Sequence, residues 1–83
     1  DGHAGEMETS CLLAIAPDLV AGTAKKEYPT FPKAILVRKK TRYWKSGVWG
    51  DPAKASAAKG REILKRVSSR AAEVVRELER FRE

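Results

Sequence analysis

The stretch Asp1-Gly2-His3-Ala4-Gly5-Glu6-Met7-Glu8-Thr9-Ser10 organises the 83-residue chain and leads into the apolar run Cys11-Leu12-Leu13-Ala14-Ile15-Ala16. It contains the only histidine of the sequence, His3, which lies between two glycines and ahead of two carboxylates. Histidine titrates near neutral pH, so His3 is the natural acid/base candidate, with Glu6 or Glu8 to orient its imidazole. The alternative interpretation is a solvated loop histidine, which is the commoner role for a residue in this setting.

The apolar run predicts a first helix over about residues 7–16, with Thr9 or Ser10 as its candidate cap. The run is apolar on every side, and a helix of that kind is normally buried. An 83-residue chain has little mass to cover such a helix, so we expect an additional segment to pack on it. Pro17 ends the regular helix, and one further turn is expected over residues 18–20.

Residues 21–50 predict an irregular connection, with a short strand at Ala34-Ile35-Leu36-Val37 where branched apolar residues gather. The run Arg38-Lys39-Lys40-Thr41-Arg42-Tyr43-Trp44-Lys45 follows. Basic residues interleaved with aromatic ones can contact a phosphate backbone while bases stack on the rings. No fold signature of a nucleic-acid-binding protein accompanies the run, so we favour a solvated basic loop whose rings pack on a neighbouring subunit. Trp49 is a candidate pocket or interface residue, with plain packing as the favoured role.

The last part of the chain predicts a long helix from Pro52 to about Phe81, because Asp51 is a good N-cap and proline a good first helical residue. Its apolar positions recur every three or four residues, at Ile63, Leu64, Val67, Ala71, Val74, Val75, Leu78 and Phe81. The stripe lacks the anchors of a membrane-surface helix, so we expect it to pack against a sheet. Gly60 costs roughly 1 kcal/mol relative to alanine, and predicts that another backbone approaches closely there.

The composition limits the function classes. There are 17 Lys and Arg against 11 Asp and Glu, and the resulting net charge of +6 favours anionic partners without selecting one. The single cysteine, Cys11, excludes an internal disulfide and fits a reducing cytoplasm, where we expect the protein to reside. No apolar run is long enough for a membrane span. The sequence also lacks a Cys/His cluster, a glycine-rich phosphate loop and a Gly-x-Ser-x-Gly elbow.

Two segments of the chain resemble the creatininase (creatinine amidohydrolase) family. The first runs from His3 to Val20 and is similar to the family's His-Gly/Ala-Gly-x-x-Glu-Thr-Ser segment and the helix that follows it. The second is Ser46-Gly47-Val48-Trp49-Gly50-Asp51-Pro52, with Ala55-Ser56 and Lys59-Gly60 behind it, and is similar to the Ser-Gly-Val-x-Gly-Asp-Pro segment before the last helix. Both segments stand in the order in which the family has them.

The resemblance implies an α/β fold, with helices on both faces of a central and largely parallel sheet. The chain resembles only the C-terminal portion of this α/β/α fold, and is itself expected to be mostly helical with at most one or two short strands. Residues 1–83 would form the C-terminal part of a single domain. Within it, the resemblance gives an active-site loop at 1–10, a buried helix at 7–20, a connection at 21–50 and a long helix at 52–81.

The resemblance also implies a metal-dependent amidohydrolase that hydrolyses a non-peptide C–N bond in a cyclic amide or a formamide. His3 matches the acid/base histidine that would pass a proton to the departing nitrogen, and Glu8 matches the carboxylate that would orient His3 or its loop. Asp1 and Gly2 occupy the part of the loop that borders the substrate. A divalent metal (zinc, manganese or iron) is implied, with ligands outside this chain and none within it. We therefore expect the chain alone to be inactive.

The partners implied by the resemblance are a missing N-terminal portion of the same enzyme and further copies in a homo-oligomer, often a hexamer. The substrate would be a small molecule, and the basic stretch 33–45 would suit a phosphorylated one. Neither nucleic acid nor a membrane is expected. Two alternatives stay open: a basic nucleic-acid-binding module that uses residues 38–45, and a structural assembly fragment that dimerises through its last helix.

Overall fold

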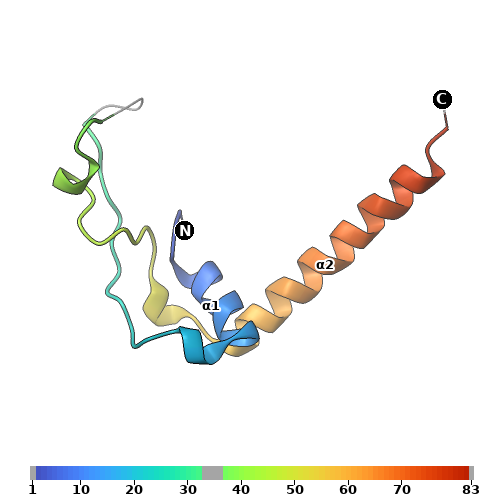
Figure 1. Ribbon diagram of the computed structural model, residues 1–83, viewed down its shortest axis with the longest axis horizontal. Coiled ribbons are helices and arrows are strands. Elements are labelled where there is room, and N and C mark those ends of the chain that lie inside the picture. Colours follow the sequence, from blue (N-terminus) through green and yellow to red (C-terminus); the bar gives the residue numbers. More distant parts are fainter. Residues whose placement is uncertain (1, 33–36, 83) are drawn as a thin grey trace.

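The computed structural model describes residues 2–32 and 37–82, and its regular structure is helical (Figure 1). Its two α-helices and three 3-10 helices are α1 (Glu6–Ile15), η1 (Pro17–Leu19), η2 (Lys40–Arg42), η3 (Pro52–Lys54) and α2 (Ala57–Arg80). Sheet-type pairing in these ranges consists of two isolated β-bridges. The expectation of a mostly helical chain with little strand is confirmed, whereas an α/β/α architecture is not seen in the described residues.

α1 begins at Glu6, with Gly5 at its N-cap, so the prediction that Thr9 or Ser10 caps this helix was wrong. Both hydroxyl residues lie inside the helix instead. Gly5 has no side chain to accept a hydrogen bond, but the two glutamates of the first turn complement the partial positive charge of the helix N-terminus. Beyond Ala16 the chain adds the single 3-10 turn η1, which confirms the extra turn expected after the proline.

α2 begins at Ala57 rather than at Pro52, where the long helix was predicted to start. The Asp51 carboxylate does act as a cap, but only for the single turn of η3. A second cap follows, because the Ser56 hydroxyl accepts a hydrogen bond of 3.2 Å from the Lys59 amide. The Asp-Pro signal was therefore correct for a helical turn and wrong for the helix that follows it.

α1 packs across η3 and the start of α2, and we call this arrangement the helix corner. Ser10 is fully buried in the corner, and its hydroxyl accepts a hydrogen bond of 3.1 Å from the Ser56 amide. Gly60 is buried opposite it, where an added Cβ would lie 1.9 Å from the Ser10 carbonyl oxygen. The close approach of another backbone that was predicted at Gly60 is confirmed.

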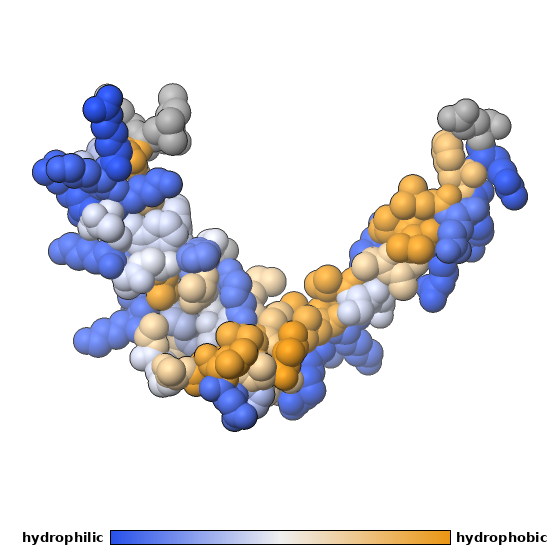
Figure 2. Space-filling model, viewed as in Figure 1, coloured by the Kyte–Doolittle hydropathy of each residue, from blue (hydrophilic) through white to orange (hydrophobic). Residues whose placement is uncertain are grey.

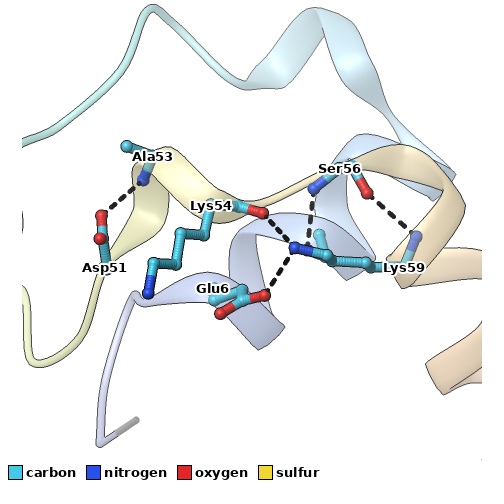
Figure 3. Close-up of polar contacts among 7 residues, drawn as sticks. Glu6, Asp51, Ala53, Lys54, Ser56 and Lys59 are labelled. Carbon is cyan, nitrogen blue, oxygen red and sulfur yellow. Dashed lines mark hydrogen bonds and ion pairs between the residues drawn. The ribbon is translucent and has the colours of Figure 1, made fainter.

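Lys59 adds a polar clip to the helix corner (Figure 3). Its ammonium group donates to the Glu6 carboxylate of α1 at 2.8 Å and to the Lys54 carbonyl of η3 at 2.7 Å. The side chains of Lys59 and Glu6 are 51% and 35% exposed, so solvent screens their attraction. The clip therefore orients three elements and contributes little free energy compared with the packing beneath it.

The second half of α2, from Val67 to Arg80, extends away from the rest of the molecule, and we call it the α2 arm (Figure 1). The large apolar side chains of the arm are between 40% and 70% exposed. Figure 2 shows apolar surface along one side of the arm and hydrophilic surface along the other. On α1, the only buried residue is Ser10, so the burial that we expected from an additional segment stays a prediction.

Within the described ranges, no helix combines the length and the apolar character needed to cross a bilayer. The predicted strand at 34–37 lies outside the described residues except for Val37, which is in irregular structure.

Candidate functional site

His3 is held through its backbone by Trp49, in an isolated antiparallel bridge. The His3 amide donates to the Trp49 carbonyl at 3.1 Å, and the Trp49 amide donates to the His3 carbonyl at 2.7 Å. The Gly2 amide donates to the same Trp49 carbonyl at 2.7 Å. An added Cβ on Gly2 would lie 2.8 Å from Trp49 Cγ, so the indole lies directly against the glycine backbone. The bridge joins two segments that are far apart in the sequence.

The imidazole of His3 is exposed and stands at the edge of a group of aromatic rings, which we call the aromatic cluster. His3 meets Trp44 edge to face, with ring centroids 5.8 Å apart. Trp44 and Trp49 are 5.7 Å apart, and Phe31 lies 6.0–6.4 Å from three rings, those of Tyr43, Trp44 and Trp49. The two rings of the basic run 38–45, Tyr43 and Trp44, therefore pack on other rings of this chain.

The loop between Trp44 and Trp49 has its own internal hydrogen bonds. The Trp44 indole donates to the Val48 carbonyl at 2.7 Å, and the Val48 amide donates to the Ser46 hydroxyl at 3.1 Å. Gly47 and Gly50 have φ angles of 80° and 147°, which residues with a side chain rarely adopt. The Ser-Gly-Val-Trp-Gly segment is thus a tight loop that presents the Trp49 backbone to His3.

Glu27 ties this loop to the preceding part of the connection, and sequence reasoning missed it. Its carboxylate accepts hydrogen bonds from the Ser46 amide at 2.9 Å, the Lys45 amide at 3.1 Å and the Ser46 hydroxyl. Its backbone pairs with Gly50 in both directions, at 3.1 and 2.8 Å. The hydrogen bond from the Ser46 hydroxyl, followed by that from the Ser46 amide, holds the pKa of Glu27 below its ordinary value. We call this set of contacts the Glu27 latch.

The structure does not bring Glu8 to His3. Glu8 lies in the first turn of α1 with its side chain exposed, and among the described residues its carboxylate has no hydrogen-bond or ion-pair partner. Glu8 borders an open hollow of about 320 Å³ between α1 and residues 19–21. Asp1 lies outside the described residues. Of the predicted site residues, only Gly2 and His3 are therefore seen together, and the roles assigned to all of them stay predictions.

The turn between His3 and α1 is strained at Ala4, which has a φ of 50°. An alanine in this left-handed region costs roughly 1–2 kcal/mol relative to its usual conformations. The turn redirects the chain from the Trp49 bridge into the first helix. Strain of this kind persists only where surrounding contacts hold it, and here the bridge lies on one side and the helix corner on the other.

A second hollow, of about 340 Å³, lies between α1, the segment after η1, and η3. It is lined mainly by small and apolar side chains, among them Ala4, Thr9, Leu13, Val20, Val48 and Pro52. No titratable side chain is among its described lining residues. The hollow therefore offers a shape for an apolar group but no acid or base for chemistry.

The chain does not supply a metal centre from the residues that can be described. Within 2–32 and 37–82, no group of three or more His, Cys, Asp or Glu side chains lies close enough to hold an ion. A divalent metal in a protein usually takes three or four such ligands. Cys11, the single thiol, is half-buried and free. These donors do not fit the metal that the resemblance implies.

Comparison with known proteins gives a match to one family model. No curated protein and no solved structure matched the chain significantly. The family model described as creatinine amidohydrolase matches residues 1–75, a range that includes the His3 loop, the Glu27 latch, the helix corner and the first part of the α2 arm. The chain belongs to the creatininase family.

Proposed function

We propose that this chain supplies the acid/base histidine loop of a creatininase-like amidohydrolase, which hydrolyses a non-peptide C–N bond in a cyclic amide or a formamide. The bridge between His3 and Trp49 carries the proposal. It joins the family's two characteristic segments, and it leaves the imidazole exposed at the edge of the aromatic cluster. A histidine at such a position can approach a substrate while its backbone stays fixed.

The proposed chemical role of His3 is to hand a proton to the nitrogen that leaves the cleaved bond. Histidine is suited to this step because it both accepts and donates a proton near neutral pH. The two-way backbone bridge and the edge of Trp44 limit the positions of the ring, and such preorganisation favours proton transfer. In this proposal Glu8 orients His3 or its loop in the complete enzyme, and Asp1 and Gly2 border the substrate.

We further propose that the exposed apolar faces of α1 and of the α2 arm dock on the remaining portion of the same enzyme. Met7, Leu12 and Ile15 of α1 are 39–69% exposed, and the arm exposes Val74, Val75 and Leu78 among others. The apolar stripe of α2 runs along one side of the helix, which suits packing against a sheet. The metal would be held by that portion, so the 83-residue chain is proposed to be inactive alone and active within a homo-oligomer of the complete enzyme.

The test compares the 83-residue chain with the complete enzyme that contains it, supplied with zinc or manganese and assayed on cyclic amides and formamides. The chain alone should show no turnover. In the complete enzyme, His3→Asn should lower kcat by about 10²–10⁴-fold with metal content unchanged. Glu79→Gln, on the exposed arm, is the matched control and should be silent. Turnover by the chain alone, or full activity of the His3 variant, would contradict the proposal.

A structural assembly role is the second candidate, and the exposed apolar side of the α2 arm favours it. If the arm pairs with a second copy, sedimentation should show a dimer that dissociates on dilution, and Leu78→Lys should yield a monomer. A monomer at every concentration would argue against this role.

A further inference from the structure

We propose that Glu27 is a positioning residue for His3, because it closes both ends of the 45–50 loop that holds the histidine. The proposal rests on the proposed function of His3 and names a residue outside the two family segments. Glu27 touches neither the imidazole nor a substrate position. It acts through the loop, in three steps that can each be followed in the hydrogen bonds and ring contacts.

The first step is the binding of the start of the loop by the Glu27 carboxylate. Its carboxylate takes three hydrogen bonds, from the Lys45 amide, the Ser46 amide and the Ser46 hydroxyl. Hydrogen bonds to a charged carboxylate are roughly twice as strong as those between neutral groups. A glutamine at this position would retain one acceptor oxygen and turn a donor amide toward one of the three donors.

The second step is the pairing of the Glu27 backbone with the end of the loop. Gly50 pairs with Glu27 in both directions, while its neighbour Trp49 pairs with His3 in both directions. Consecutive residues of an extended segment point their amide and carbonyl groups to opposite sides, so one side of the loop end meets Glu27 and the other meets the histidine. Gly50, which pairs with Glu27, and Trp49, which pairs with His3, are thus adjacent in the sequence.

The third step fixes the ring contact of the imidazole. Trp44, which meets His3 edge to face, directly precedes the latched Lys45. Its indole is held from inside the loop by the Val48 carbonyl. Loss of the carboxylate hydrogen bonds would free the start of the loop and so shift the Trp44 ring away from the histidine, even if the backbone bridge at Trp49 persisted.

The experiment uses NMR on the 83-residue chain, where His3 is the only histidine and its imidazole signals are unambiguous. In the unaltered chain, the ring current of Trp44 should displace the His3 signals from their positions in an unstructured peptide. Glu27→Gln should remove most of this displacement, with the helical circular dichroism unchanged. Glu79→Gln makes the same chemical change at an exposed position on α2 and should leave His3 as it was.

Ser46→Ala keeps both amide donors of the latch and removes only the hydroxyl, so it should shift the His3 signals in the same direction by a smaller amount. It also serves as the test if Glu27→Gln fails to fold. The proposal is overturned if the amide signals of residues 45 and 46 move in either variant while the His3 signals do not.

Activity of the complete enzyme separates this proposal from the one it rests on. Glu27→Gln should lower kcat by about tenfold to a hundredfold with KM little changed, as expected for a displaced catalytic group. If His3→Asn retained full activity, the proposed function would fail whatever the NMR result. If His3→Asn were inactive and Glu27→Gln fully active, only the positioning role would fail.

Discussion

The helix corner lies at the start of α2 and the α2 arm at its end, and the two regions differ in the size of the side chains on the apolar side of the helix. In the corner the small residues Ser10 and Gly60 let two helix backbones touch. In the arm, apolar positions recur every three or four residues and carry large aliphatic side chains such as Val67 and Leu78, which are 61% and 70% exposed. The chain therefore packs its small residues within the helix corner, whereas the large aliphatic side chains of the arm stay exposed.

The largest expected effect comes from closing the contact at Gly60. Gly60→Ala would place a Cβ 1.9 Å from the Ser10 carbonyl oxygen, so the two helices must separate. We expect the free energy of unfolding to fall by about 3 kcal/mol, the upper range for overpacking. Helix propensity alone predicts the opposite sign, a stabilisation of about 1 kcal/mol. Urea unfolding followed by circular dichroism decides between them, and a stabilised variant would show that the corner is not closely packed.

The next effect concerns the buried hydroxyl on the other side of the same contact. Ser10→Ala leaves the Ser56 amide without the acceptor that it has at 3.1 Å. We expect a loss of about 1–2 kcal/mol, because the half-buried Ser56 amide is left without its partner. Ser68→Ala, on the exposed arm, is the matched control and should be neutral or slightly stabilising. Equal effects of the two substitutions in thermal unfolding would mean that the buried hydrogen bond is unimportant.

A pair of truncations compares the two ends of the stripe directly. Ile63 is half-buried beside α1, so Ile63→Ala should cost about 1–2 kcal/mol, a part of the value for a fully buried site. Leu78 is 70% exposed, so Leu78→Ala should change the stability of the chain by less than about 0.5 kcal/mol. Similar losses at both positions would show that the arm is already covered when the chain is in solution.

The smallest effect is the pH dependence of the Lys59 clip. The hydrogen bond from Lys59 holds the pKa of Glu6 below its ordinary value of 4.5, although partial burial opposes this. Its contribution to stability is therefore complete above pH 4.5 and is lost as the pH falls through the lowered value. Between pH 7 and pH 3, the midpoint of thermal unfolding should fall less steeply for Glu6→Gln than for the control Glu79→Gln. The same pH dependence in both variants would mean that the clip does not form in solution.

The helices were largely predictable from the sequence, because apolar spacing and proline positions are local signals. The start of α2 was not, although Asp51 and Pro52 carry a valid cap signal. The chain ends that turn early and begins again at Ser56, whose amide bonds to Ser10 on a distant part of the chain. Gly60 was predictable as a close approach because glycine inside a helix is costly without such a reason.

The candidate site was only partly predictable. His3 drew attention as the single histidine, but its partner Trp49 follows from a long-range pairing that no local pattern encodes. Glu27 lies in an irregular connection without periodicity. One signal could have found it, because Glu27 is the only acidic residue between Asp18 and Asp51 in a strongly basic stretch. The α/β/α architecture was inferred from resemblance, and single-residue bridges do not establish it.

The hydrogen bond between Ser56 and Ser10 joins residues 46 positions apart, so the helix corner also closes a long loop. The entropy lost in closing a flexible loop grows only with the logarithm of its length, by about 0.6 kcal/mol for each doubling. Adding or deleting a few residues between Gly22 and Lys26 would therefore change the closing entropy very little. A length variant of this chain with such a change should therefore keep the same corner, provided that Glu27 and the segments on either side stay in register.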